Sequence, residues 1–249
     1  METTVKSCVL TAHNGKGWYV EGQKRLVTSL VHHGCAHDIV ALEIITSGNE
    51  WLVCGSINGQ PIKDSLSTKY KSDCVYTLKA AAFDHVRRLG YDTILWLDCS
   101  VWAIKDIEPV FDAIATQGHY FWRSGWTLGQ TTSQKCLDYF MISREEAFDI
   151  NDCSTSMFGL KLSNPDSKKF LEDWLSAAAH GIFHGSRAEV PGKDDSIPRQ
   201  QKFEHRQDQS VATCLIHLMD MTMHEPGHFS QYGNIEGDYP ESVCLVMRG

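Results

Sequence analysis

A short apolar run that ends in a carboxylate is the feature of this sequence that most restricts its fold. Ile94, Leu95, Trp96 and Leu97 follow one another without a polar residue, and Asp98 comes directly after them. Such a run is typical of a strand buried on both faces, as the central strand of a parallel sheet is. Because ligands of open α/β sheets bind at the carboxyl ends of the strands, Asp98 is a candidate ligand-binding residue. The alternative is a carboxylate that only caps the following turn.

The order of the other expected elements indicates an α/β fold. The chain opens with a predicted strand, helix and strand, and strands joined in this way lie parallel in one sheet. We therefore expect a mostly parallel central sheet flanked by helices. The expected strands are residues 7–13, 38–45, 50–54, 94–97, 119–122, 157–162 and 241–247, and the main helices are residues 18–33, 75–89 and those that begin near 107, at 164 and near 208. Residues 55–74 and 123–135 are expected to be loops, and the polar stretch 184–206 a flexible loop that closes over a ligand.

The composition is that of an ordinary globular chain. Of its 249 residues, 42% are hydrophobic and 22% are charged, which suits one large domain that spans residues 1–249. No apolar run approaches the ~20 residues that cross a bilayer, and the first residues lack the pattern of a signal peptide. The nine cysteines form no Cys-x-x-Cys pair, so a reducing, cytoplasmic setting is expected. The net charge of −8 argues against a protein that grips nucleic acid by bulk charge.

Asp98, Cys99 and Ser100 form the first candidate cluster. Two acidic residues two positions apart in an extended segment point the same way and can share a divalent cation. Here the third position is Ser100, a weaker and neutral ligand. One carboxylate, completed by water and phosphate oxygens, is still a normal shell for Mg²⁺ or Mn²⁺. His224 and His228, in a loop near the C-terminus, are further candidate ligands, although a single histidine in a loop is more often solvated.

Asp208 and Gln209 form the second cluster, at the start of an amphipathic helix. Asp is a preferred N-cap residue and suits the positive end of a helix dipole, so a purely structural role is one interpretation. The other is that both side chains project into the ligand crevice, which the long polar stretch before them favours. Lys79, in the helix before the central strand, is either a solvated surface lysine or a cation that reaches a pyrophosphate.

In combination, these segments resemble the GT-A-fold glycosyltransferases. The helix that carries Lys79 and leads into the strand ending at Asp98-Cys-Ser100 is similar to the donor-binding segment of that family, where the strand ends in Asp-x-Asp. Residues 205–211, His-Arg-Gln-Asp-Gln-Ser-Val, resemble the Asp-Gln helix start that several such families place beside the sugars. The likeness covers residues 5–247 as an ordered series of short motifs.

This resemblance implies a nucleotide-sugar-dependent glycosyltransferase, hexosyl or pentosyl, with a GT-A-like (Rossmann-like) domain. The donor would be a nucleoside-diphosphate sugar, with UDP as the expected nucleotide, and the acceptor a glycan or another hydroxyl compound. Asp98 would bind Mn²⁺ or Mg²⁺ at the pyrophosphate, beside Ser100 and Cys99. His228 or His224 would complete the metal shell.

The resemblance also implies roles for the remaining candidates. Lys79 would contact the donor, and Asp208 and Gln209 would face the reacting sugar. In an inverting enzyme Asp208 would be the general base, and in a retaining enzyme it would stabilise the reacting state.

Three other functions remain open from the sequence. A sugar-phosphate nucleotidyltransferase has a similar sheet, but residues 11–17, Thr-Ala-His-Asn-Gly-Lys-Gly, lack the Gly-rich phosphate loop that such enzymes need. A non-catalytic module that binds nucleotide-sugars would tolerate Ser100 in place of a second acid. A glycosyltransferase that acts on a modified nucleic-acid base is the third, and the net charge counts against it.

Overall fold

The computed structural model describes residues 6–48, 50–62, 66–71, 73–185, 205–234 and 236–247. Most of the polar stretch expected at 184–206 therefore lies outside the described residues. Within them, no helix combines the length and the apolar character needed to cross a membrane. All nine cysteines are described, and all are free thiols.

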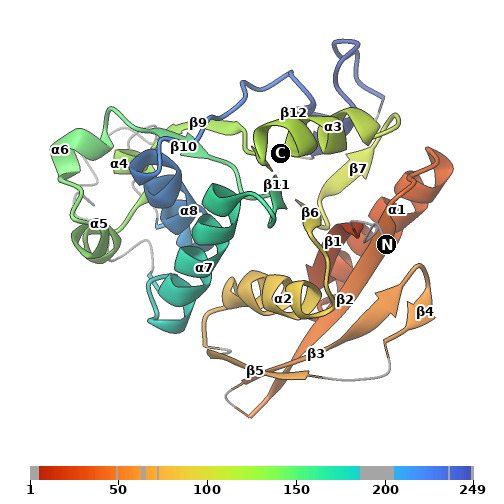
Figure 1. Ribbon diagram of the computed structural model, residues 1–249, viewed down its shortest axis with the longest axis horizontal. Coiled ribbons are helices and arrows are strands. Elements are labelled where there is room, and N and C mark those ends of the chain that lie inside the picture. Colours follow the sequence, from red (N-terminus) through yellow and green to blue (C-terminus); the bar gives the residue numbers. More distant parts are fainter. Residues whose placement is uncertain are drawn as a thin grey trace.

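Helices and strands follow one another along the whole chain (Figure 1). The helices are α1 (Gly17–His32), α2 (Thr77–Arg88), α3 (Glu108–Gln117), α4 (Leu128–Thr131), α5 (Gln134–Phe140), α6 (Arg144–Ala147), α7 (Pro165–Ala179) and α8 (Gln207–Leu218). The strands are β1 (Ser7–His13), β2 (Asp38–Ser47), β3 (Glu50–Ile57), β4 (Gln60–Pro61), β5 (Leu66–Lys71), β6 (Thr93–Leu97), β7 (Val101–Ala103), β8 (His119–Tyr120), β9 (Arg123–Thr127), β10 (Asn151–Cys153), β11 (Met157–Lys161), β12 (Ser230–Tyr232) and β13 (Leu245–Met247).

The central sheet has the strand order β4-β3-β2-β1-β6-β11-β8, and β5 also pairs with β3. Strand β1 is parallel to both of its neighbours, β2 and β6, as the opening strand, helix and strand predict. The other pairings described in this sheet are antiparallel, so the expectation of a mostly parallel sheet is wrong. A short hairpin between β2 and β3 forces antiparallel pairing there, and an apolar pattern does not encode the direction of β11.

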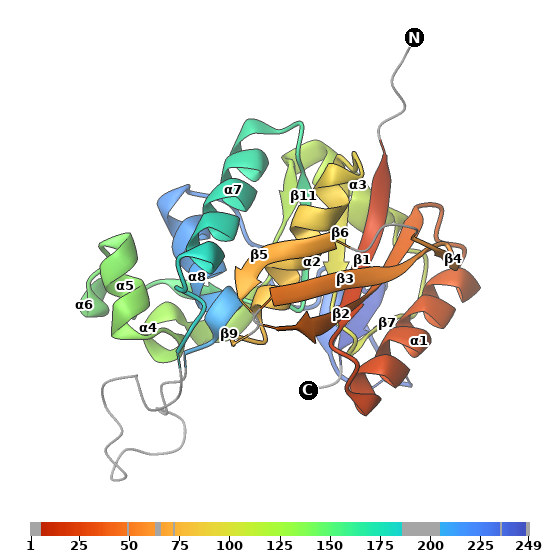
Figure 2. The ribbon, with the colours of Figure 1, turned by 90° about the horizontal axis from the view of Figure 1, so that it is seen from below.

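Strand β6 is buried on both faces, as its apolar run predicts. Ile94 and Trp96 belong to a core cluster with residues of α2 and α7, whereas Leu95 and Leu97 belong to a second cluster with residues of α1 and α3. In Figure 2 the first strands of the sheet run between α1 and α2. The predicted flanking of the sheet by helices is therefore confirmed, and β6 lies where both cores meet.

Two stretches expected to be loops contain regular structure. Strands β4 and β5 lie within residues 55–74 and extend the sheet beyond β3. Residues 123–135 contain β9 and α4, and Thr127 and Gln130 close the first turn of α4 as a capping box. A Thr-x-x-Gln spacing is the signature of this box, although the composition of the stretch is that of a loop.

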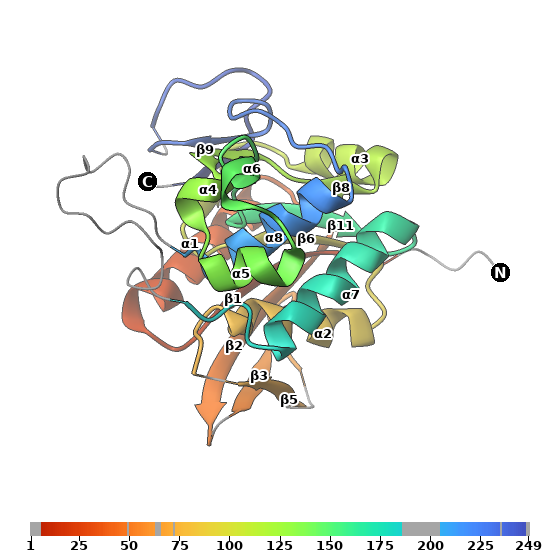
Figure 3. The same ribbon diagram turned by 90° about the vertical axis from the view of Figure 1, so that its left-hand side faces the viewer.

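The start of α7 agrees with its prediction in detail. Asn164 caps the helix, because its Oδ1 accepts hydrogen bonds from the backbone N–H groups of Asp166 (3.0 Å) and Ser167 (3.1 Å). Helices α7 and α8 lie side by side, and α4, α5 and α6 group beyond them on one side of the molecule (Figures 1 and 3). This packing brings the start of α8 to the carboxyl end of β6, where Lys79 of α2 joins both.

Candidate active site

Asp98 lies directly at the carboxyl end of β6, the position predicted for a ligand-binding carboxylate. Its backbone N–H donates to the carbonyl of Ser156 (2.8 Å), just before β11. The indole Nε1 of Trp96 donates to its Oδ1 (2.7 Å). Because 32% of the side chain is still exposed, Asp98 is fixed by the strand yet accessible to a ligand.

The ammonium group of Lys79 joins two carboxylates from distant parts of the chain. Its Nζ lies 3.2 Å from Oδ1 of Asp98 and 2.9 Å from Oδ2 of Asp208. It also donates to the carbonyl oxygen of Thr155 (2.9 Å). These three contacts use all three N–H groups of the lysine ammonium. Lys79 can therefore donate a hydrogen bond to a phosphate only after it loses one of these contacts. Lys79 is buried, so the solvated-lysine interpretation is wrong.

Burial and charge act against each other in this cluster. Loss of hydration lowers the pKa of Lys79, but the charges of Asp208 and Asp98 outweigh it and leave that pKa above its ordinary value. Loss of hydration raises the pKa of Asp98, and the Lys79 charge opposes this while Asp208 reinforces it. Two carboxylates against one ammonium leave the cluster net negative. Such a cluster stabilises positive charge, whether on a bound cation or on a reacting carbon.

Asp208 does not cap its helix, so the interpretation as an N-cap is wrong. Arg206 holds the N-cap position, and Asp208 is the second helical residue, with 2% of its surface exposed. Its Oδ2 accepts from the hydroxyl of Thr155 (2.8 Å) as well as from Lys79. The preceding Gln207 has φ 43°, a left-handed conformation that non-glycine residues rarely adopt. Backbone strain of this kind concentrates at functional sites.

Gln209 is held by a buried acid that the sequence motifs do not single out. Its Nε2 donates to Oδ2 of Asp152, a fully buried residue of β10. Ser124 (3.0 Å) and Thr213 (2.6 Å) also donate to the same carboxylate. Burial raises the pKa of Asp152 to about 6, although these hydrogen bonds lower it. The one feature of the sequence that could have indicated a buried acid here is the position of Asp152 between the apolar residues Ile150 and Cys153.

Two hollows meet at this cluster and share Tyr76, Lys79 and Asp98 in their walls. The smaller, about 200 Å³, lies against the ends of β1 and β6 and has an aromatic lining. The larger, about 510 Å³, lies against the start of α8 and contains Asp208 and Gln209. Most of the predicted site residues are thus brought together around one junction.

The smaller hollow adds residues that the motifs did not indicate. Besides Tyr76, its aromatic lining includes Trp18, Tyr19 and Trp96, and Cys99 and Ser100 also lie in its wall. Asn14, after β1, lines it too, and its buried Oδ1 has no hydrogen-bond partner among the described residues.

The structure does not bring the two candidate histidines into these hollows. His224 and His228 stack on each other, with ring centroids 4.6 Å apart, and neither lines either hollow. Among the described residues, no group of three or more His, Cys, Asp or Glu side chains is arranged to hold a metal ion. Among the described residues, Asp98 is the carboxylate common to both hollows, and Asp208 lines the larger one.

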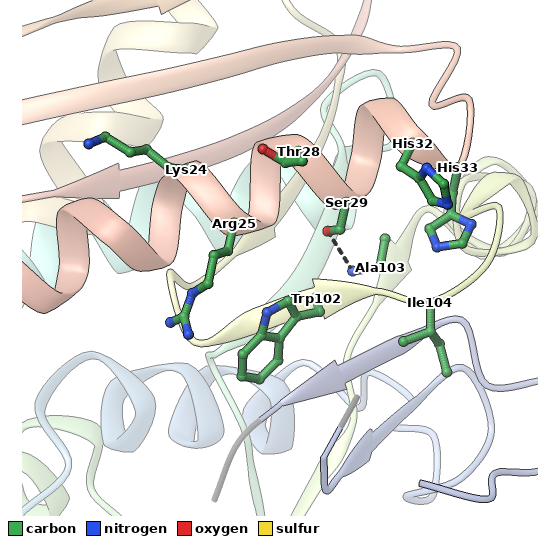
Figure 4. A pocket seen from close by; sticks show the side chains of 9 residues that line it. All are labelled: Lys24, Arg25, Thr28, Ser29, His32, His33, Trp102, Ala103 and Ile104. Atoms are coloured by element: carbon green, nitrogen blue, oxygen red, sulfur yellow. Dashed lines mark hydrogen bonds between the residues drawn. The ribbon is translucent and has the colours of Figure 1, made fainter. Parts of the chain in front are cut away.

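A third hollow, about 610 Å³, lies between α1 and β7, away from the carboxylates (Figure 4). Its wall includes Arg25, whose guanidinium lies 5.0 Å from the ring centre of Trp102, and Ser29, which accepts a hydrogen bond from the backbone of Ala103. Among the residues that the structure describes, no acid lines this hollow. It therefore lacks the carboxylate chemistry found at the end of β6.

Comparison with solved structures identifies the fold. One similar structure is a glycosyltransferase involved in the glycosylation of the major capsid of PBCV-1, with a TM-score of 0.50 and 11% identity over 97% of this chain and 93% of the other. Another is the WbbM bifunctional glycosyltransferase, with a TM-score of 0.53 and 10% identity over 99% of this chain and 46% of the other. The chain thus has a glycosyltransferase fold, as the sequence motifs predict. Neither protein-family models nor curated protein sequences gave a match.

Proposed function

We propose that this protein is a glycosyltransferase that moves a sugar from a nucleoside-diphosphate sugar, with UDP as the expected nucleotide, to a hydroxyl acceptor. One observation carries the proposal: two hollows meet at a pair of carboxylates, Asp98 and Asp208, at the carboxyl end of a central strand. Ligands of open α/β sheets bind at this edge. The glycosyltransferase fold supports the same assignment.

The proposal places the nucleotide in the smaller hollow. Its aromatic side chains suit a base and a ribose. The diphosphate then lies at Asp98, and the sugar points across the junction into the larger hollow. The acceptor enters that hollow beside Asp208 and Gln209.

In the proposed reaction the anomeric carbon exchanges one oxygen for another. The bond from that carbon to the diphosphate oxygen breaks, a bond to the acceptor oxygen forms, and the acceptor proton leaves. Lys79 and Thr155 both engage Oδ2 of Asp208, while none of the described residues donates to its Oδ1. Oδ1 can therefore accept the acceptor's proton, or stabilise positive charge on the sugar ring.

In this proposal a divalent cation would bind only together with the diphosphate of the donor. Mn²⁺ or Mg²⁺ that arrives with the diphosphate would find one carboxylate ligand, Asp98, and would offset the negative charge of the leaving group. The step assigned to Asp208 does not depend on it.

Binding measurements test the donor site directly. We expect a nucleoside diphosphate and its sugar derivatives to raise the melting temperature selectively, because a ligand that binds the native state stabilises it by mass action. Asp98→Ala should weaken this effect in the presence of Mn²⁺, and a comparison in chelator shows how far it depends on a cation. A panel of UDP-, GDP- and ADP-sugars without any selective stabilisation would contradict the proposal.

A further inference from the structure

The buried carboxylate of Asp152 has no role in the reaction proposed above, yet it contacts a residue of the larger hollow. Asp152 is fully buried on β10, and Gln209 is 8% exposed on α8. Three side chains donate to the carboxylate: Ser124 from β9, Gln209 and Thr213. Burying a carboxylate costs desolvation free energy, which its three hydrogen-bond donors only partly offset. A residue kept at such a cost is a candidate for a functional role.

The direction of one hydrogen bond fixes the orientation of the Gln209 amide. An ionised carboxylate only accepts hydrogen bonds, so it selects the NH₂ end of a glutamine over its carbonyl end. Because Nε2 of Gln209 donates to Asp152, Oε1 on the same amide group points away from that carboxylate. None of the described residues donates to this Oε1, and Gln209 lies in the wall of the larger hollow.

We propose that Asp152 is a positioning residue that turns the carbonyl oxygen of Gln209 into the larger hollow, where it accepts a hydrogen bond from a sugar hydroxyl. This inference rests on the proposed glycosyltransferase function and adds a specificity determinant to it. A glutamine free to flip would present a donor half of the time. The fixed amide favours substrates that carry a hydroxyl donor at this point and disfavours analogues that lack one.

Reversing the pair tests the orientation. In Gln209→Glu two carboxylates face each other and can hold one shared proton. Turnover of UDP-glucose by this variant should fall as pH rises and that proton is lost, by roughly tenfold per pH unit. In the double variant Asp152→Asn/Gln209→Glu an amide again faces a carboxylate, with the roles exchanged. Its turnover should lack this fall, so that the ratio of double to single variant rises at least tenfold between pH 7 and pH 9.

A matched control removes a different hydrogen bond from the same carboxylate. Ser124→Ala deletes one donor to Asp152 but leaves the contact with Gln209, so its profile should keep the shape of the wild type and shift only to higher pH, because the lost hydrogen bond lowers the pKa of Asp152. Equal pH profiles for the single and double Gln209 variants would overturn the inference, because a purely structural contact gives no reason for rescue.

A second measurement needs no active variant. In protein labelled with ¹⁵N-glutamine, the side-chain NH₂ signal of Gln209, assigned by its loss in Gln209→Glu, should titrate with Asp152 near pH 6. Ser124, Thr213 and, at longer range, Arg206 are the other groups that act on this carboxyl. A signal that stays constant while the pH is lowered through the titration of Asp152 itself would overturn the inference. A wild-type protein that turns over none of a panel of UDP-, GDP- and ADP-sugars would instead contradict the proposed function, and the titration would still test the orientation.

Discussion

At the scale of single residues, the site depends on Lys79 and the two carboxylates it joins. Removing one partner of a buried ion pair leaves an uncompensated charge, which costs far more than an exposed pair is worth. Asp98 and Asp208 therefore stabilise the fold through Lys79 while each keeps one carboxylate oxygen for a ligand. Because each carboxylate has both roles, only a substitution that keeps its size and shape can change activity without also unfolding the protein.

Asp208→Asn is the most informative of these substitutions. The amide keeps the size and one acceptor, so we expect a stability loss of about 1–3 kcal/mol as Lys79 loses a counter-charge. Turnover should fall further than stability explains, by on the order of 10²–10⁴-fold, because the charge and basicity are gone. Urea unfolding and initial rates measure the two effects. Asp173→Asn, in an exposed pair with Lys169, is the matched control and should change neither. Full activity in Asp208→Asn would remove Asp208 from the chemistry.

Asp152 predicts a pH dependence of stability. Its pKa is about 6 in the folded protein against an ordinary 3.8, so between these values the folded state keeps a proton that the unfolded state has lost. Stability from this group is therefore present at low pH and is lost as pH rises from ~4 to ~6, by about 3 kcal/mol. Asp152→Asn cannot ionise, so its free energy of unfolding relative to the wild type should rise over that range. A constant difference would contradict the assignment.

At the scale of elements, helix α1 must approach the site closely. Gly22 faces the backbone just after Asp98, and a Cβ there would lie 2.3 Å from the carbonyl oxygen of Cys99. Backbone atoms cannot rotate aside as a side chain can. The fit between α1 and the end of β6 therefore depends on this glycine, although nothing in the sequence around Gly22 indicates a functional role.

Gly22→Ala tests that fit. Alanine favours a helix by roughly 0.5–1 kcal/mol, but overpacking costs typically about 1–3 kcal/mol, so we expect a net loss of stability. Displacement of Cys99 should also weaken nucleotide binding, measured by calorimetry. Gly17→Ala, at the start of the same helix with no atom within 4 Å of the new Cβ, should leave both unchanged. Unaltered affinity in Gly22→Ala would show that the end of β6 tolerates movement of α1.

The elements also show what the sequence could predict. Local signals were reliable: the apolar run of β6 and the Asn-Pro start of α7 fixed the position of both elements. The direction of β11 was not predictable, because antiparallel and parallel strands with two buried faces have the same apolar pattern. The contact between Asp152 and Gln209 was equally hidden, since 57 residues separate the two in the chain and only the fold brings them together.

At the scale of the whole molecule, two layers of helices enclose a mixed sheet whose parallel centre ends at the site. Strand β6 supplies Asp98, α2 supplies Lys79 and α8 supplies Asp208, so three elements converge on one ammonium group. The two hollows meet at that point. In the proposed function this arrangement keeps donor and acceptor apart until they meet at the carboxylates.

The central claim is that this junction transfers a sugar, and release of nucleoside diphosphate tests it most directly. The protein is incubated with the nucleotide-sugar that stabilises it and a mixture of simple glycosides, and mass spectrometry follows both the nucleotide and the sugar. We predict that the nucleoside diphosphate and a glycosylated or hydrolysed sugar appear together, and that Asp98→Asn and Asp208→Asn sharply reduce both while remaining folded. A donor that binds at this site and is recovered intact would contradict the account and identify a binding module instead.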